Sequence, residues 1–211
     1  MNTLIVVESP AKARKIQNYF KNEKIKVTSS QGHIYDLPKE KMSIDTENNF
    51  KPNYRPIRGK EKIIKSLRDL SKTNHILLAA DDDREGDAIA WHCGKVMKLK
   101  FNEKNRIIFH EISKKAIERS LQNVHSLNMN SVNAQQARRI IDRLVGYSLS
   151  PCLWKHIQSK KMGLSAGRVQ STLLKILKEH EDSINNFEPE YSYDFNGDFQ
   201  FDTNKIQCDL L

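Results

Sequence analysis

Short apolar runs alternate with helical patterns over the first half of the chain. Four runs have the length and composition of buried strands: 3–7, 25–29, 75–80 and 106–109. Amphipathic patterns typical of helices occur between and after them, at 11–20, 59–70, 84–99 and 114–124. This alternation predicts an α/β fold with a mainly parallel sheet that is flanked by helices on both faces.

The regular alternation breaks at residues 39–58 and stops near residue 121. Residues 39–58 are polar and Lys-rich, so we expect an exposed insertion there. From residue 122 the pattern is purely helical, and the helix expected at 133–147 has an apolar stripe that we interpret as its core side. The stripe consists of Ala137, Ile140, Ile141, Leu144 and Val145.

The sequence pattern changes again in the last part of the chain. After a helix that begins near Arg168 and ends near Ile184, aromatic and polar residues alternate from Tyr191 to Phe201, as in a strand or hairpin. We therefore predict three parts. They are an α/β domain at 1–121, a helical segment at 122–187 and the first strands of a truncated β domain at 188–211.

The charge of the chain narrows the choice of partners. The net charge is +9, and the positive charge is concentrated before Glu188, since the last 24 residues hold six acids and one lysine. This balance favours a polyanion, with nucleic acid ahead of an anionic membrane surface. No apolar run approaches the ~18 residues that cross a membrane. The start of the chain does not resemble a secretion signal.

The three cysteines, Cys93, Cys152 and Cys208, are far apart and form no C-x-x-C pair. They are typical of reduced thiols, so we expect a cytoplasmic, nucleoid-associated location or its viral or organellar equivalent, and no zinc site.

A cluster of acids follows the apolar run 75–80. Asp81, Asp83 and Glu85 alternate along the chain, so a turning backbone can direct all three carboxylates the same way. Like charges this close need a cation, and Mg²⁺ prefers oxygen ligands and requires only one or two direct carboxylates. The alternative is a solvated acidic loop.

Glu8 lies at a second strand-to-helix turn, with Lys12 one helical turn further on. If the two strands are neighbours in a parallel sheet, Glu8 faces the acid cluster, and Lys12 can reach the same place. The alternative for Glu8 is an acid favoured by the positive end of a helix.

Basic residues on the helical segment suggest contacts with phosphates. Opposite its apolar stripe, the helix 133–147 carries Gln135, Arg138, Arg139 and Asp142, with Arg143 and Lys155 nearby. An ordinary solvated face is the alternative. The glycines and Ser165 before Arg168 could seat a phosphate on backbone N–H groups. Their G-x-S-x-G spacing does not indicate a hydrolase, because no apolar strand precedes it. His33 lies in a Gly- and Pro-containing loop, as a ligand donor or as a surface histidine.

Taken together, these strings resemble the type IA DNA topoisomerases in the order in which that family has them. They are VVESPAKARKI, SSQGHIYDLP, GKEK, AADDDREGDAIAWH, IIFHEIS, NAQQARRIIDRLVGY, SPCLWKHI and GLSAGRVQS. The acidic motif alone is less specific, because primases and some nucleases share this metal-binding fold, called Toprim. The resemblance implies a Toprim domain, part of a helical DNA-gripping domain and the start of an arch domain.

The resemblance also implies roles for individual residues. It places Mg²⁺ at Asp81, Asp83 and Glu85, with Glu8 as a further ligand and as acid/base for the 3′-oxygen, and with Lys12 stabilising phosphate charge. Matched positions that contact or orient single-stranded DNA are His33, Arg138, Arg139, Ile140, Asp142, Arg143, Ser148, Lys155, Gly163, Leu164, Ser165, Ala166, Gly167 and Arg168. We add Arg84 and Gln170 to these expected DNA contacts.

Two positions depart from the family pattern. Asp82 stands where the family usually has proline or an apolar residue, which adds charge without replacing a ligand. None of the six tyrosines lies in the Y-x-R-T-D-S-like setting of the family's nucleophile, and covalent catalysis fails without it.

We therefore interpret the chain as an amino-terminal fragment that relaxes negatively supercoiled DNA only as part of the intact enzyme. The missing carboxy-terminal part could be supplied by another chain. The alternatives are a stand-alone Toprim DNA-binding module and a Toprim nuclease or primase.

Overall fold

The computed structural model describes residues 2–21, 24–157, 163–202 and 204–209. The chain forms two compact units, residues 1–167 and residues 168–211. The three-part division of the chain stays a prediction.

A parallel sheet lies at the centre of the first unit. Among the described residues it has the order β2-β1-β7, with β2 at Ile25–Ser29, β1 at Asn2–Val7 and β7 at Asn74–Leu78. In the shared register Ile5 lies opposite Val27 on one side and opposite Leu77 on the other. Because β1 is central and parallel to both neighbours, all three strands end at the same edge of the sheet.

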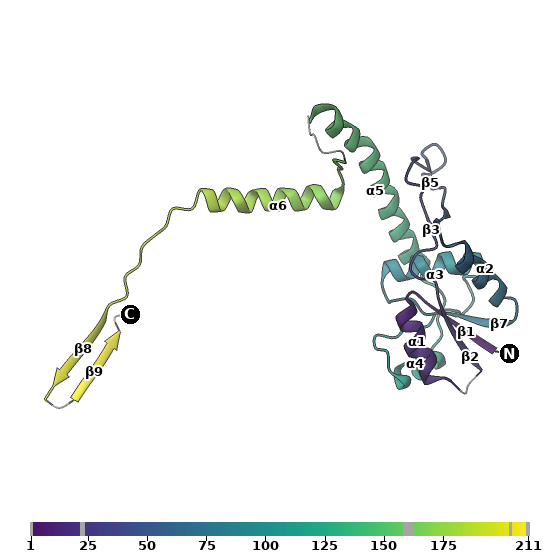
Figure 1. The fold of residues 1–211 in the computed structure, drawn as a ribbon, viewed down its shortest axis with the longest axis horizontal. Coiled ribbons are helices and arrows are strands. Elements are labelled where there is room, and N and C mark those ends of the chain that lie inside the picture. The colour runs from purple at the N-terminus through teal and green to yellow at the C-terminus, as the bar shows by residue number, and fades with distance from the viewer. Residues whose placement is uncertain (1, 22–23, 158–162, 203, 210–211) are drawn as a thin grey trace. The chain divides into compact units, whose positions relative to one another are not determined.

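Helices cover both faces of this sheet (Figure 1). On one face Ile5 and Val7 pack with residues of α1 (Pro10–Tyr19) and α4 (Lys114–Gln122). On the other face Leu4 and Val6 pack with residues of α2 (Glu61–Leu70) and α3 (Arg84–Val96). Successive β1 side chains thus alternate between two apolar clusters, and the α/β fold predicted from the sequence is confirmed.

The prediction of a strand at 106–109 is wrong. In the described range 24–157, Arg106 forms only isolated bridges, parallel to Leu78 and antiparallel to His125. The Leu78 N–H donates to the Asn105 carbonyl, and the Leu78 carbonyl accepts the Ile107 N–H. If the strand continued, its next pair of ladder hydrogen bonds would use the carbonyls of Ala80 and Ile107. The Arg106 guanidinium donates to both carbonyls, so a side chain takes the place of that rung.

The insertion at 39–58 is mostly exposed, as expected. Together with the residues just before it, it forms two short antiparallel pairs. These are β3 (Tyr35–Asp36) with β6 (Arg55–Pro56), and β4 (Ile44–Asp45) with β5 (Lys51–Pro52).

The helix α5 (Met129–His156) is longer than expected, and its predicted core stripe is only partly packed, since Ile140, Leu144 and Val145 are half-buried. Ala137 is exposed and Ile141 is 44% exposed, while the buried residues of α5 are Val132 and Ser150. The polar side also makes contacts, because Arg139 and Arg143 bind the loop that follows His33.

The second unit begins with α6 (Arg168–Asn185), close to the range expected from the sequence. The hairpin of β8 (Asn196–Phe201) and β9 (Asn204–Asp209) follows, paired antiparallel. Among the described residues, no helix has both the length and the apolar character needed to cross a membrane.

Candidate metal and nucleic acid site

The acidic turn connects the end of β7 to the start of α3. Asp83 is the N-cap of α3, and its carboxylate accepts the Gly86 N–H at 2.6 Å. An ionised N-cap is stabilised by the positive end of the helix dipole. The turn is tight, because a Cβ on Gly86 would lie 2.1 Å from the Asp81 carbonyl oxygen. Glycine is therefore needed where the helix begins against the strand end.

Glu8, Lys12 and Asp81 meet at the edge of the sheet. The Lys12 ammonium donates to Glu8 Oε1 at 2.6 Å and also to the Asp81 carboxylate. The Asp81 N–H donates to Glu8 Oε2 at 3.3 Å. The adjacency of β1 and β7, and of Glu8 and Asp81, is thus as the sequence predicted.

The protonation of this group follows from its contacts. Interaction with the side chains of Glu8 and then Lys12 lowers the pKa of the Asp81 carboxyl, against the opposing effect of burial. Burial alone would lower the pKa of Lys12, but its hydrogen bonds to Asp81 and Glu8 outweigh burial and raise it. Asp81 is therefore a carboxylate at neutral pH, held next to the Lys12 ammonium.

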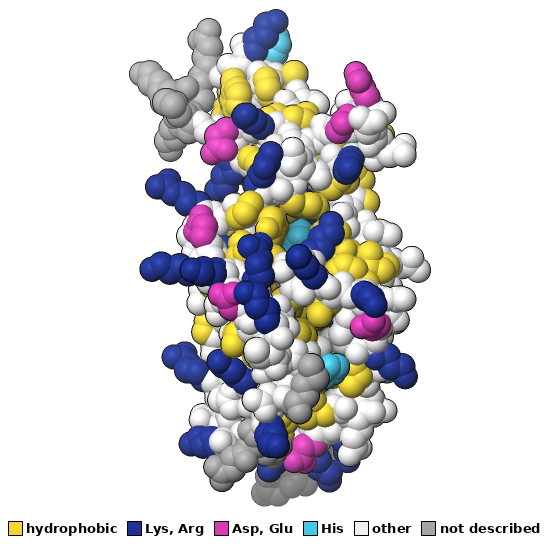
Figure 2. All heavy atoms as spheres, turned by 90° about the vertical axis from the view of Figure 1, so that its right-hand side faces the viewer, with side chains coloured by type: hydrophobic (Ala, Val, Ile, Leu, Met, Phe, Trp, Pro, Cys, Tyr) yellow, Lys and Arg dark blue, Asp and Glu magenta, His cyan; other side chains and the backbone are white. Residues whose placement is uncertain are grey.

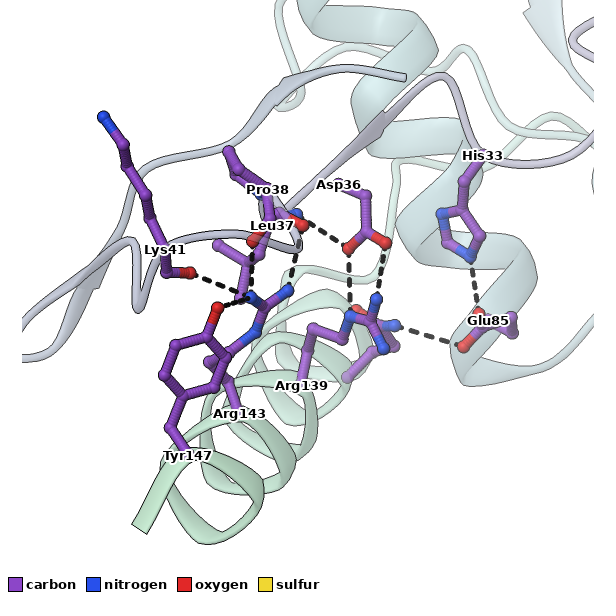
Figure 3. Close-up of polar contacts among 10 residues, drawn as sticks. His33, Asp36, Leu37, Pro38, Lys41, Glu85, Arg139, Arg143 and Tyr147 are labelled. Atoms are coloured by element: carbon purple, nitrogen blue, oxygen red, sulfur yellow. Dashed lines mark hydrogen bonds and ion pairs between the residues drawn. The ribbon is translucent and has the colours of Figure 1, made fainter. Parts of the chain in front are cut away.

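Glu85 points to different partners. His33 Nε2 donates to one of its carboxylate oxygens at 2.5 Å (Figure 3). The Gln135 amide donates to the other carboxylate oxygen at 3.1 Å. Burial raises the pKa of Glu85, and these two hydrogen bonds more than offset it, so the pKa is lowered. Glu85 thereby links the acidic turn to the His33 loop and to α5.

The four predicted metal ligands do not all converge. Within the described residues, no group of three His, Cys, Asp or Glu side chains is placed to hold a metal ion together. Glu8 and Asp81 share the Lys12 ammonium, whereas Asp83 caps α3 and Glu85 bonds to His33 and Gln135. The pair of Glu8 and Asp81 suits Mg²⁺, because it offers two carboxylates and already binds a cation, and Mg²⁺ completes its shell with water.

The polar side of α5 holds the loop that follows His33. The Arg139 guanidinium binds both carboxylate oxygens of Asp36, with an Nε–Oδ1 distance of 3.0 Å. Arg143 donates to the carbonyls of Leu37 and Lys41, each at 2.9 Å, and to that of Pro38 (Figure 3).

The aromatic ring of Tyr147 extends this contact. The Arg143 guanidinium lies 5.2 Å from the ring centre of Tyr147, whose hydroxyl donates to the Lys39 carbonyl. Residues 139, 143 and 147 follow the i, i+4 spacing of one helix face. The alternative of an ordinary solvated face is therefore wrong for Arg139 and Arg143.

A cavity of about 420 Å³ lies between this loop, α3 and α5. It is lined by His33, Tyr35, Asp36, Tyr54, Glu85, His92, Gln135, Arg138, Arg139 and Asp142. Four of the predicted DNA-contact residues, His33, Arg138, Arg139 and Asp142, thus share one cavity with Glu85. Arg138 is exposed there and faces Asp142 at 3.9 Å.

A second cavity, of about 550 Å³, lies beside the end of α5, and Arg139, Asp142, Arg143, Ser165 and Ala166 are among its lining residues. The segment before Arg168 is held there, because the Leu164 carbonyl accepts from Trp154 at 2.6 Å and the Ala166 N–H donates to Ser150 at 3.1 Å. Gly163 has a φ of +107°, which favours glycine.

The remaining predicted DNA contacts do not line these cavities in the described structure. Ile140 is half-buried, while Arg84, Ser148 and Lys155 are exposed. Gly167 ends the first unit, and Arg168 and Gln170 are exposed residues of the second. Sequence reasoning assigned no role to Asp36, Tyr147 or Arg106. The spacing of Tyr147 from Arg139 and Arg143 could have indicated its place, whereas no local pattern marks Arg106.

Comparisons with known proteins match this arrangement. Residues 3–112 match the Toprim domain family, and residues 126–209 match the family described as DNA topoisomerase. The chain is also similar to the full-length topoisomerase I of Thermotoga maritima, with 46% identity and a TM-score of 0.81 over 92% of this chain. This chain belongs to the type IA DNA topoisomerases. It covers 32% of the length of the Thermotoga chain, so it corresponds to about a third of that topoisomerase.

Proposed function

We propose that this chain supplies the metal-binding and DNA-binding part of a type IA topoisomerase. The intact enzyme would relax negatively supercoiled DNA without ATP, by cutting one strand, passing another and resealing the cut. The observation that carries the proposal is the meeting of Glu8, Lys12 and Asp81 at the carboxyl edge of the sheet, where open α/β folds bind ligands.

We propose that Glu8 and Asp81 hold Mg²⁺ directly, with Asp83 and Glu85 completing its acidic surroundings. The ion, when bound, neutralises negative charge on a DNA phosphate. Lys12 places a fixed positive charge beside the same carboxylates, where it can stabilise charge that develops on the phosphate. Glu8 can hold or release the proton of the 3′-oxygen.

A single-stranded segment of DNA is the proposed partner. His33 and Arg138 line the cavity next to Glu85, so a backbone crossing this cavity would lead towards the acidic turn. The net charge of +9 supports a polyanionic partner. Figure 2 shows many Lys and Arg side chains, with apolar patches between them, on the face that carries α2 in Figure 1.

We propose that the nucleophilic tyrosine comes from outside this chain. The Tyr19 hydroxyl donates to the Ile112 carbonyl at 3.1 Å, and the Tyr147 hydroxyl donates to Lys39. Burial, with a further effect of Asp36, raises the pKa of Tyr54 to about 12, which is the opposite of what an attacking phenolate needs. Tyr35 lies in a short strand, and Tyr191 and Tyr193 belong to the second unit.

Two assays on the purified chain test this proposal. Fluorescence anisotropy with a labelled single-stranded oligonucleotide should show binding that weakens steeply with salt. Arg138→Gln should reduce the salt slope by about one phosphate contact, whereas Arg119→Gln, an exposed arginine on α4, should leave it unchanged.

Supercoiled plasmid incubated with the chain and Mg²⁺ should stay supercoiled. Relaxation would show that the chain carries its own nucleophile. Nicking that Asp83→Asn abolishes would instead indicate a Toprim nuclease. Absence of any binding to single-stranded DNA would contradict the DNA-binding role.

A further inference from the structure

Arg106 is a fully buried cation next to the acidic turn. Its side chain is 1% exposed, and its guanidinium makes one ion pair and several hydrogen bonds to carbonyl groups. The Nη1 group donates to Ala80 at 2.7 Å and to Ile107 at 2.9 Å, and Nη2 donates to Asp81 at 2.7 Å. Nε donates to the Asp87 carboxylate at 3.2 Å.

These bonds join the two ends of the acidic turn. Ala80 and Asp81 stand where the chain leaves β7, and Asp87 lies in the first turn of α3, 7% exposed. Arg106 therefore bridges the segment that carries Asp81, Asp83 and Glu85. It also occupies the next rung of the β ladder, so the chain after Leu78 is free to turn towards Glu8 instead of continuing the sheet.

The energetics argue against a purely stabilising role. Taking a guanidinium out of water costs several kcal/mol, and replacing a buried ion pair by apolar side chains is often neutral or stabilising. A rigid planar fork that binds several acceptors at once is, however, well suited to fixing the shape of a turn. Partners of this kind behind metal ligands orient the ligands and tune their affinity.

We propose that Arg106 is a positioning residue that holds the acidic turn in the shape that binds Mg²⁺. This inference rests on the proposed metal-binding function. It also assigns a role to Asp87, which anchors the other end of the bridge and balances the buried charge.

Isothermal titration of the full chain with MgCl₂ tests the proposal. The decisive variant is Arg106→Lys, which keeps the positive charge but loses the planar guanidinium group. The matched control is Arg119→Lys on the exposed side of α4. Arg106→Lys should weaken Mg²⁺ binding about tenfold or more, the usual effect of losing such a supporting partner. Arg119→Lys should bind like the wild type.

Asp87→Asn is a second test variant, since it keeps the size of the side chain and removes the charge that pairs with Arg106. It should also weaken Mg²⁺ binding, and it decides the question if Arg106→Lys does not fold. Circular dichroism at the titration temperature shows that each variant is folded, and a merely structural role would change stability without changing the affinity of the folded protein. If the wild type binds Mg²⁺ and the folded variants bind it equally well, the positioning role is refuted. If the wild type binds none, the proposed function fails and takes this inference with it.

Discussion

Replacement of Gly86 by alanine should distort the acidic turn. In most helices this change is stabilising by up to about 1 kcal/mol, because alanine loses less backbone freedom. Here the new Cβ would lie 2.1 Å from the Asp81 carbonyl oxygen. Ordinary contact begins at 3.4 Å, so the strand end and the helix must separate by about 1.3 Å or more. Crowding of this kind costs about 1–3 kcal/mol.

The same shift would disturb the bond from Arg106 Nη2 to the Asp81 carbonyl, and hydrogen bonds to charged groups contribute about 1.5–3 kcal/mol. After subtraction of the helix gain, Gly86→Ala should destabilise the first unit by about 1.5–5 kcal/mol. It should also weaken Mg²⁺ binding, because Asp81 moves relative to Glu8.

Two other helical glycines provide matched controls. A Cβ on Gly146 of α5 would lie 3.6 Å from the Ala166 carbonyl oxygen, an ordinary contact, so Gly146→Ala should be neutral or slightly stabilising. A Cβ on Gly94 would lie 2.5 Å from the edge of the Phe101 ring, which can rotate away, so Gly94→Ala should fall between the two. Urea unfolding followed by circular dichroism measures all three. If Gly86→Ala is as stable as Gly146→Ala and binds Mg²⁺ like the wild type, our account of the turn is wrong.

Three further predictions follow from individual contacts. Lys12→Met should tighten Mg²⁺ binding about fivefold in calorimetry, because the ammonium no longer neutralises Glu8 and Asp81; weaker binding would contradict this. Arg139→Ala should cost about 1 kcal/mol in urea unfolding, since its ion pair with Asp36 is partly exposed, and a double-mutant cycle with Asp36→Asn should show coupling between the two. Burial lowers the pKa of His92 to about 3, so the unfolded chain binds the proton more readily and stability falls as the pH drops below about 6.5. In the His92→Phe variant, the free energy of unfolding should fall by about 1 kcal/mol less between pH 7 and pH 5.5 than in the wild type. An unchanged pH profile would contradict this role of His92.

The sequence predicted the parts of the site that depend on strand order. Glu8 and Asp81 each follow an apolar run that leads into a helix, and parallel neighbouring strands bring such positions to one edge. The burial of β1 and β7 on both faces also follows directly from their continuous apolar runs.

The sequence could not show which side of α5 is packed. Periodicity separates an apolar from a polar stripe, but it does not identify the surface that each stripe meets. Arg139 and Arg143 face the carboxylate of Asp36 and a series of loop carbonyls, and these partners are more than 100 residues away in the chain. In the same way, the apolar run at 106–109 predicts a strand, because nothing local shows that a guanidinium replaces its next rung.

The central claim is that the carboxylates of Glu8 and Asp81 form a divalent cation site. Crystals of the chain soaked in Mn²⁺, which accepts the same oxygen ligands as Mg²⁺, test it most directly. We predict an anomalous difference peak within coordinating distance of both carboxylates, with the Lys12 ammonium displaced from between them. An empty site at high Mn²⁺ concentration, or a peak that contacts neither Glu8 nor Asp81, would contradict the account.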